Sequence, residues 1–289
     1  MSDFIIITDS ACDLKPETMK QLGVKCCDIT FLFEGEEDRE YKNESIGNKE
    51  FYDMMRAGKV AKTAAVNADS LGKVFEEELK EGRDVLYIGF SSGLSTTFNS
   101  SCIAAEELLK KYPDRKIICV DSLCASGGFG MLIFLAVEKK NEGASIEEVA
   151  DYAREKIPQI AHWFTVDNLV YLKRGGRISA TTALLGGALN IKPILHADNE
   201  GRLASCEKAR GRRKSLKGLV SKYGETAIET GRGPVYITHA DCEEDARIIE
   251  QELKEKYGVS VDMIFDIGPV IGAHCGPGTV ALFFLAKQR

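Results

Sequence analysis

The sequence predicts an α/β protein of two domains, an N-terminal domain with a parallel sheet and a C-terminal domain with a mixed sheet. In the first half, strand-length apolar runs, short polar turns and helical patterns alternate repeatedly, which is typical of a parallel sheet. In the second half, Asp198-Asn199-Glu200-Gly201 between two strand patterns indicates a hairpin and therefore antiparallel pairing. A length of 289 residues is large for one hydrophobic core and suits two. A helix stop at Pro158 sets the expected domains at residues 1–158 and 159–289.

The first half alternates strands and helices. Pro16 is suited to open a helix and Gly23 to close it, Ser145 and Glu148 form a capping box, and Thr63 lies in a loop between two helical patterns. Acidic residues make 34–44 a surface loop or small hairpin. The predicted strands are 4–7, 24–33, 85–89 and 116–120, and the predicted helices are 16–22, 51–55, a segment ending at 79, a segment beginning near 103, a helix from 131, and 145–157.

The second half begins with a short helix that ends in basic residues and glycine, Lys173-Arg174-Gly175-Gly176. The hairpin follows, and a helix, a strand, a helix and two further strands complete the chain. The predicted strands are 191–197, 202–208, 235–238, 259–265 and 280–284, and the predicted helices are 168–172, a helix from 215, and 243–256.

Composition limits the function. With 44% hydrophobic and 28% charged residues the chain is typical of a globular protein, and its longest apolar runs are too short to span a bilayer, so no transmembrane segment is expected. A net charge of −6 argues against a nucleic-acid partner. The nine cysteines contain no CxxC pair, and the four histidines have no zinc-like spacing. These features predict reduced thiols, a cytoplasmic location and no bound metal.

The most informative stretch is FSSGLSTTFNSS, residues 90–101, between a predicted strand and a predicted helix. Such a turn directs hydroxyl groups and the free N–H groups of the first helical turn at one point, which suits a carboxylate or phosphate. A helix cap formed by Ser95 or Thr96 is the simpler interpretation. One cap does not need the seven hydroxyls of this stretch, so the sequence favours an anion site here.

Two further stretches are candidates for binding. Residues 267–278 are dense in glycine and proline, which predicts a constrained loop close to a ligand, and His274 is its single polar side chain. Arg177 lies beyond the glycine cap of its helix, where it does nothing for the helix. Residues 208–214 form a basic cluster that is either a solvated face, a phosphate site or a docking surface for an acidic partner.

A serine hydrolase is the alternative from a different class. Gly89-Phe90-Ser91-Ser92-Gly93 matches G-x-S-x-G between a strand and a helix, and Ser91, then Asp262 or Asp266, then His274 follow the order of an α/β-hydrolase triad. Against this interpretation, the motif is short and the hydrolase fold has one continuous sheet, whereas two domains are expected here.

The chain resembles the DegV family of bacterial fatty-acid-binding proteins. The resemblance is carried, in order, by residues 7–10, the loop with Thr63, Ser91 to Ser95, Val120 to Ser122, Leu172 to Ser179, Lys208 to Arg210, and Gly268 to Gly278. It implies a two-domain α/β carrier that encloses a long-chain fatty acid and needs no other cofactor.

The resemblance also implies roles for individual residues. The fatty-acid carboxylate is expected to be bound by Thr63, by Ser95 or Ser92, and by His274. Some members of the family present the acid to a separate fatty-acid kinase, and Arg210, with Arg177, is expected to face that partner or a phosphate. We therefore expect a cytoplasmic lipid carrier that is not itself an enzyme, with a serine hydrolase as the alternative and a ligand-gated sensor as the third possibility.

Overall fold

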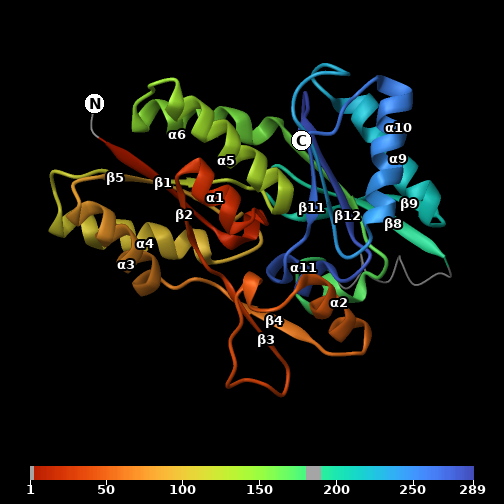
Figure 1. Ribbon diagram of the computed structural model, residues 1–289, viewed down its shortest axis with the longest axis horizontal. Helices are drawn as coiled ribbons and strands as arrows, with labels where there is room; N and C mark the ends of the chain where they lie inside the picture. Colours follow the sequence, from red (N-terminus) through yellow and green to blue (C-terminus); the bar gives the residue numbers. More distant parts are fainter. Residues whose placement is uncertain (1–2, 180–189) are drawn as a thin grey trace.

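The computed structural model describes residues 3–179 and 190–289 and forms an α/β fold with two main sheets. The two sheets and their helices lie side by side, with the N-terminal half at the left of Figure 1 and the C-terminal half at the right. All strands of the first sheet precede residue 122, and all strands of the second begin at residue 160 or later. The predicted fold class is confirmed.

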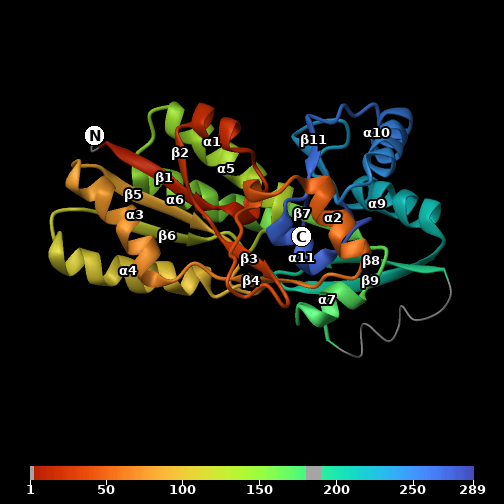
Figure 2. The same ribbon diagram turned by 60° about the horizontal axis from the view of Figure 1, so that its bottom comes forward.

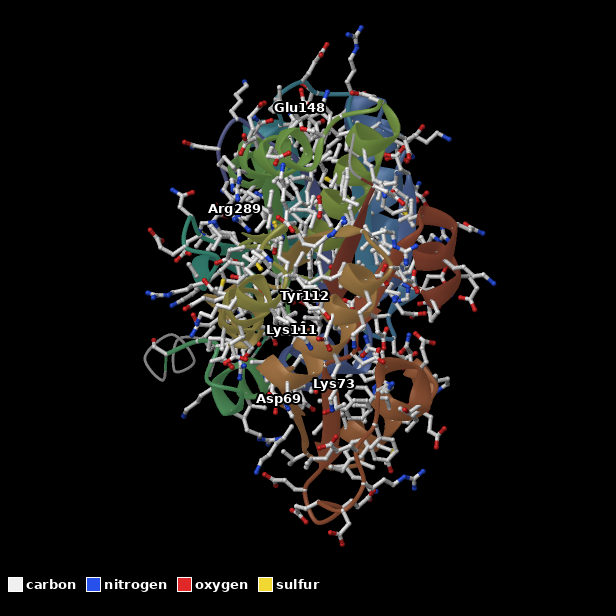
Figure 3. All side chains as sticks on the ribbon, turned by 90° about the vertical axis from the view of Figure 1, so that its left-hand side faces the viewer. Asp69, Lys73, Lys111, Tyr112, Glu148 and Arg289 are labelled. Atoms are coloured by element: carbon white, nitrogen blue, oxygen red, sulfur yellow. The ribbon has the colours of Figure 1, made fainter. Side chains whose placement is uncertain are left out.

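The first sheet is parallel throughout, with the order β2-β1-β5-β6. Helices α5 and α6 cover one face and α3 and α4 the other (Figure 2), while α1 packs on β2. Figure 3 looks onto the outer end of this half, where α3 carries Asp69 and Lys73, and Lys111 and Tyr112 lie at the end of α4. The elements are β1 Phe4–Asp9, η1 Ser10–Cys12, α1 Pro16–Leu22, β2 Val24–Cys27, α3 Ala68–Lys80, β5 Asp84–Gly89, α4 Thr97–Lys111, β6 Ile117–Asp121, α5 Ser126–Asn141, α6 Ile146–Lys156 and η3 Ile157–Gln159.

The second sheet is mixed, with the order β11-β10-β12-β7-β8-β9, and only β10 and β11 pair in parallel. Side chains alternate between its faces: Trp163 packs in the core under α9 and α10, whereas Phe164 packs in the core shared with the first half. The elements are β7 Ile160–Thr165, α7 Val170–Arg174, β8 Ile191–Ala197, β9 Leu203–Arg210, α9 Arg212–Thr226, β10 Val235–His239, α10 Glu243–Tyr257, β11 Met263–Asp266, α11 Pro269–Cys275 and β12 Val280–Leu285.

A small two-stranded unit, which we name the flap (residues 30–64), projects from the body at the bottom of Figure 1. It consists of β3 Thr30–Phe33, η2 Asn43–Ser45, α2 Asn48–Arg56 and β4 Ala61–Ala64. The flap belongs to the first half of the sequence but packs on α11 of the second half. The Tyr52 hydroxyl donates to the Ile267 carbonyl at 2.7 Å, and Arg56 forms an ion pair with Asp241. The flap and α11 are therefore held together by long-range contacts.

The structure changes three local expectations. Residues 24–33, expected as one strand, form β2 and β3, which belong to different sheets. Thr63 lies in β4, opposite Phe31, and not in a loop. The stretch expected as a loop around His274 contains α11, which begins at Pro269 after an extended Gly268. The first two differences follow from the pairing of β3 with β4 inside the flap. In the third, α11 packs on β3, β4 and α2 of the flap.

Candidate functional site

A cavity of about 510 Å³ lies between the two halves of the protein. Its lining is mostly apolar, with Phe90 and Leu123 from the first half and Phe164, Val270 and Phe283 from the second. The volume is within the range of small-molecule sites, roughly 300–1,000 Å³. The lining also includes Thr63, Ser92, Ser95, Arg177 and His274, five of the six residues that the sequence predicts for binding.

Thr63 and His274 are joined directly by a hydrogen bond of 2.8 Å between Thr63 Oγ1 and His274 Nε2. They are 211 positions apart in the chain, and the contact forms because β4 of the flap packs on α11. Burial and the nearby charge of Arg177 lower the pKa of His274 from its ordinary value of 6.5 to about 4. His274 is therefore neutral at pH 7, and one of its ring nitrogens carries a hydrogen.

The environment of the two ring nitrogens indicates where that hydrogen lies. Nδ1 of His274 is buried and has no hydrogen-bond partner among the described residues. Buried N–H groups without a partner are rarer in folded proteins than buried acceptors without one, which favours the tautomer with its hydrogen on Nε2. With the hydrogen on Nε2, His274 donates to Thr63 Oγ1. This arrangement leaves the hydroxyl hydrogen of Thr63 free to donate into the cavity.

The serine turn supplies two more hydroxyls. Ser95 Oγ accepts a hydrogen bond from the Thr97 backbone N–H at 3.2 Å and lies 3.0 Å from Thr97 Oγ1. The Ser92 hydroxyl makes no hydrogen bond to any other described residue, and its backbone N–H donates to Asp121 at 3.1 Å. Ser95 is half-buried and Ser92 is exposed, yet both border the cavity. The choice between them therefore stays a prediction.

Arg177 borders the same end of the cavity. Its Nε and Nη2 atoms donate to the Leu94 carbonyl at 3.1 and 2.8 Å, and Nη1 donates to the Gly175 carbonyl. The side chain is half-buried, and burial lowers its pKa. No carboxylate in residues 3–179 and 190–289 pairs with it. Arg177 thus has no counter-ion among the described residues, and it donates to the carbonyl of Leu94, the residue before Ser95. An anion bound here would be stabilised by its charge.

Sequence reasoning missed the role of Asp9, which holds the serine turn in place. Its Oδ2 atom accepts hydrogen bonds from the Phe90 N–H and the Tyr87 hydroxyl, each at 2.8 Å, and Oδ1 accepts from the Ala11 N–H at 3.1 Å. Burial raises the pKa of Asp9 to about 6. The available signal was its position at the carboxyl end of the first strand, where ligands collect in parallel sheets.

Known proteins are similar to this chain in both sequence and fold. The profile of the DegV family, described as uncharacterised proteins, matches residues 3–287. The chain belongs to the DegV family. A DegV domain-containing protein of Clostridium perfringens is 41% identical over 289 residues, which cover 100% of this chain and 99% of the relative.

Solved structures of DegV proteins are similar over the whole chain. A DegV family protein from Thermus thermophilus, reported for its fatty acid binding, is 30% identical with a TM-score of 0.88, and the match covers 99% of this chain and 100% of the other. DegV of Bacillus subtilis, described as a fatty acid binding protein, is 28% identical with a TM-score of 0.84 over 99% and 100% of the two chains.

In this DegV-family chain, the residues of the alternative hydrolase triad are directed to separate partners. Ser91 is fully buried; its Oγ donates to the Gly201 carbonyl at 2.8 Å and accepts from the Gly93 N–H at 3.2 Å. Asp262 accepts from the Val235 N–H, Asp266 lies 3.6 Å from His239, and His274 bonds Thr63. Within the described residues these groups form no hydrogen-bonded chain. Ser91 instead joins the serine turn to the hairpin between β8 and β9.

Arg210 lies apart from the cavity lining. It is the last residue of β9, it is exposed, and it makes no ion pair with another described residue. Lys208, Arg213 and Lys214 nearby are exposed as well. A partner-facing role for Arg210 stays a prediction.

The described part of the chain has neither a metal-binding cluster nor a membrane-spanning helix. Between residues 3 and 179 and between 190 and 289, no group of three or more His, Cys, Asp or Glu side chains could hold a metal ion. Over the same ranges, no helix has the length and apolar character needed to cross a bilayer.

Proposed function

We propose that this protein is a carrier that binds one long-chain fatty acid, with the acyl tail in the cavity and the carboxylate at Thr63, Ser95 or Ser92, His274 and Arg177. The observation that carries the proposal is the hydrogen-bonded pair Thr63–His274 at the border of an apolar cavity, together with the Arg177 guanidinium, which has no carboxylate partner among the described residues. The fatty acid binding reported for the DegV proteins of Thermus thermophilus and Bacillus subtilis supports the same ligand class.

The chemistry of the site suits a carboxylate. A carboxylate accepts hydrogen bonds and carries one negative charge. The free hydrogen of the Thr63 hydroxyl, a serine hydroxyl and the Arg177 guanidinium are all donors, and only the guanidinium is charged, because His274 is neutral. His274 then acts through Thr63, whose oxygen it holds in place.

Affinity and orientation have different sources. A palmitate-sized tail has about fourteen methylenes, and burying each one stabilises the complex by roughly 0.8 kcal/mol, or about 11 kcal/mol before the costs of ordering. A hydrogen bond to the carboxylate contributes only about 1.5–3 kcal/mol. The tail therefore sets most of the affinity, and the polar groups set which end of the ligand lies at the serine turn.

Native mass spectrometry of the protein as purified tests the ligand class. We expect an added mass that denaturation releases as a long-chain fatty acid. In the Thr63→Ala/Ser95→Ala double variant, we expect a folded protein with weaker or misplaced lipid. Absence of any acyl chain, together with no binding of added fatty acid by the delipidated protein, would contradict the proposal.

Delivery to a partner is the second part of the proposal. Arg210 is exposed, belongs to the basic group of residues 208–214 and has no ion pair with another described residue. Such a group suits an acidic surface such as that of a fatty-acid kinase. Arg210→Ala should leave fatty-acid affinity unchanged and slow phosphorylation of the bound acid by such a kinase. Equal phosphorylation of both proteins would remove Arg210 from the partner surface. The cytoplasmic location stays a prediction.

A further inference from the structure

The ends of two short helices meet beside the predicted carboxylate site, and two glycines make the contact possible. At Gly175, directly after α7, a Cβ atom would lie 2.3 Å from His274 Nδ1 and 3.3 Å from both Cγ and Cε1 of the same ring. At Gly276, directly after α11, a Cβ atom would lie 2.2 Å from the ring of Tyr171. Each helix end thus receives an aromatic side chain of the other.

The backbone of Gly175 does not itself require glycine. Its φ of −69° and ψ of −10° lie in the right-handed helical region, which every L-residue adopts readily. The next residue differs: Gly176 has a φ of +73°, and a Cβ atom there would meet nothing within 4 Å. Glycine at 176 is explained by the turn of the chain, whereas glycine at 175 is explained by the imidazole that lies against it.

We propose that Gly175 is a positioning residue for the carboxylate site: its missing Cβ lets the His274 imidazole lie against the end of α7 with Nε2 on Thr63. The same residue also holds the cation of the site, because the Gly175 carbonyl accepts a hydrogen bond from Arg177 Nη1. The end of α7 therefore sets the positions of His274 and Arg177 relative to each other. The proposal rests on the proposed function only for its ligand.

A side chain at position 175 would displace the imidazole. Carbon and nitrogen atoms in contact stay about 3.5 Å apart, so a Cβ at 2.3 Å requires a relative movement of about 1 Å. The displaced atom belongs to a rigid ring and not to the end of a flexible chain. Nε2 would lose its 2.8 Å geometry with Thr63 Oγ1, and hydrogen bonds are lost at about 3.6 Å.

The experiment compares a fatty acid with the alcohol of the same chain length. Both ligands bury the same tail, but only the acid uses the carboxylate site. For Gly175→Ala, we expect the affinity for hexadecanoic acid to fall about tenfold or more, the cost of one hydrogen bond to a charged group, with the affinity for hexadecanol unchanged. Gly47→Ala is the matched control, since Gly47 has an ordinary φ of −63° and open space around it. It should leave both affinities unchanged.

A second variant shows whether the effect acts through the imidazole. In a His274→Ala background no ring lies against position 175, so Gly175→Ala should add no further loss of acid affinity. If Gly175→Ala lowers the melting temperature, the double variant should recover most of that loss. An unchanged ratio of acid to alcohol affinity in Gly175→Ala, or the same loss in the His274→Ala background, would overturn the proposal.

A measurement without ligand separates this proposal from the proposed function. In NMR spectra of the ligand-free protein, Gly175→Ala should shift the imidazole signals of His274, and Gly47→Ala should not. If wild-type protein binds neither acid nor alcohol while the His274 signals shift as expected, the proposed function fails and the positioning role stands. If the signals stay unchanged, the positioning role fails whatever the ligand is.

Discussion

Among the described residues that line the cavity, Arg177 is the one cation. Its replacement by glutamine removes this charge and keeps a side chain that can donate to the Leu94 carbonyl. In the ligand-free protein Arg177 donates twice to that carbonyl and has no carboxylate partner among the described residues. The charge therefore contributes little to folding. Its contribution appears when an anion binds, and Arg177→Gln is expected to fold normally.

The size of the effect follows from the charge lost. Two unit charges about 4 Å apart attract by about 4 kcal/mol at an effective dielectric constant near 20, and solvent at a half-exposed site reduces this value. Hydrogen bonds to charged groups contribute about 1.5–3 kcal/mol. The dissociation constant for hexadecanoic acid should thus rise about 10-fold to 150-fold. The constant for hexadecanol should stay the same, because its head group is neutral.

The assay is a titration of delipidated protein with each ligand by calorimetry or by displacement of a fluorescent fatty acid. Arg174→Gln is the matched control, since Arg174 is the exposed last residue of α7, three positions before Arg177, and does not border the cavity. In addition, the pKa of His274 should rise above about 4 in Arg177→Gln, because the arginine charge is one of the two causes that lower it. Equal acid affinity for wild-type protein and Arg177→Gln would refute the reasoning.

Three further predictions concern pH, the alternative nucleophile and the flap. The pKa of His274 is about 4 in the folded protein and 6.5 ordinarily, so protonation favours the unfolded state. The stability that the neutral imidazole contributes is present above pH 6.5 and is lost as the pH falls toward 4, by up to about 3 kcal/mol. His274→Ala should therefore flatten the fall of the melting temperature over that pH range. Ser91→Ala should lower the free energy of unfolding by about 1–3 kcal/mol, because the buried Gly201 carbonyl loses its donor. A fluorophosphonate probe should label neither the wild type nor this variant. Labelling of Ser91 in the wild type would favour the hydrolase. Tyr52→Phe should also lower the free energy of unfolding, measured with a chemical denaturant, by about 1–3 kcal/mol, because it removes the donor to the Ile267 carbonyl before α11. Tyr152→Phe, at a half-exposed position of α6, is the control and should leave that free energy unchanged. Equal losses in the two variants would argue against a role for the flap contact.

Much of the fold could be predicted from local patterns. The alternation of strand, polar turn and helix before residue 122 corresponds to a parallel sheet, and the turn at Asp198 to Gly201 joins an antiparallel pair. The capping box of Ser145 and Glu148 starts α6 as expected. These features depend on residues a few positions apart, so their physical causes are complete within a short segment of sequence.

The candidate site could be predicted only in part from the residues themselves. The hydroxyl-rich turn and the glycine-rich stretch around His274 were visible as unusual local patterns, and the resemblance to DegV proteins connected them with Thr63. Arg177 was expected to face a partner or a phosphate, and the structure places its side chain at the border of the cavity. Nothing in the basic pattern of residues 173–177 indicates that the guanidinium would reach a carbonyl 83 positions earlier in the chain.

By itself, the sequence determined the α/β class and the two sheets, because periodicity, caps and turn residues act over a few positions. It also predicted an anion-binding turn at residues 90–101. Only the tertiary structure decided that Thr63 of the flap meets His274 of α11, that Ser91 is a structural donor, and that Gly175 leaves room for an imidazole. These contacts join segments about 100 or more positions apart. Whether they form depends on how whole helices and strands pack against one another, and no local pattern of residues contains that information.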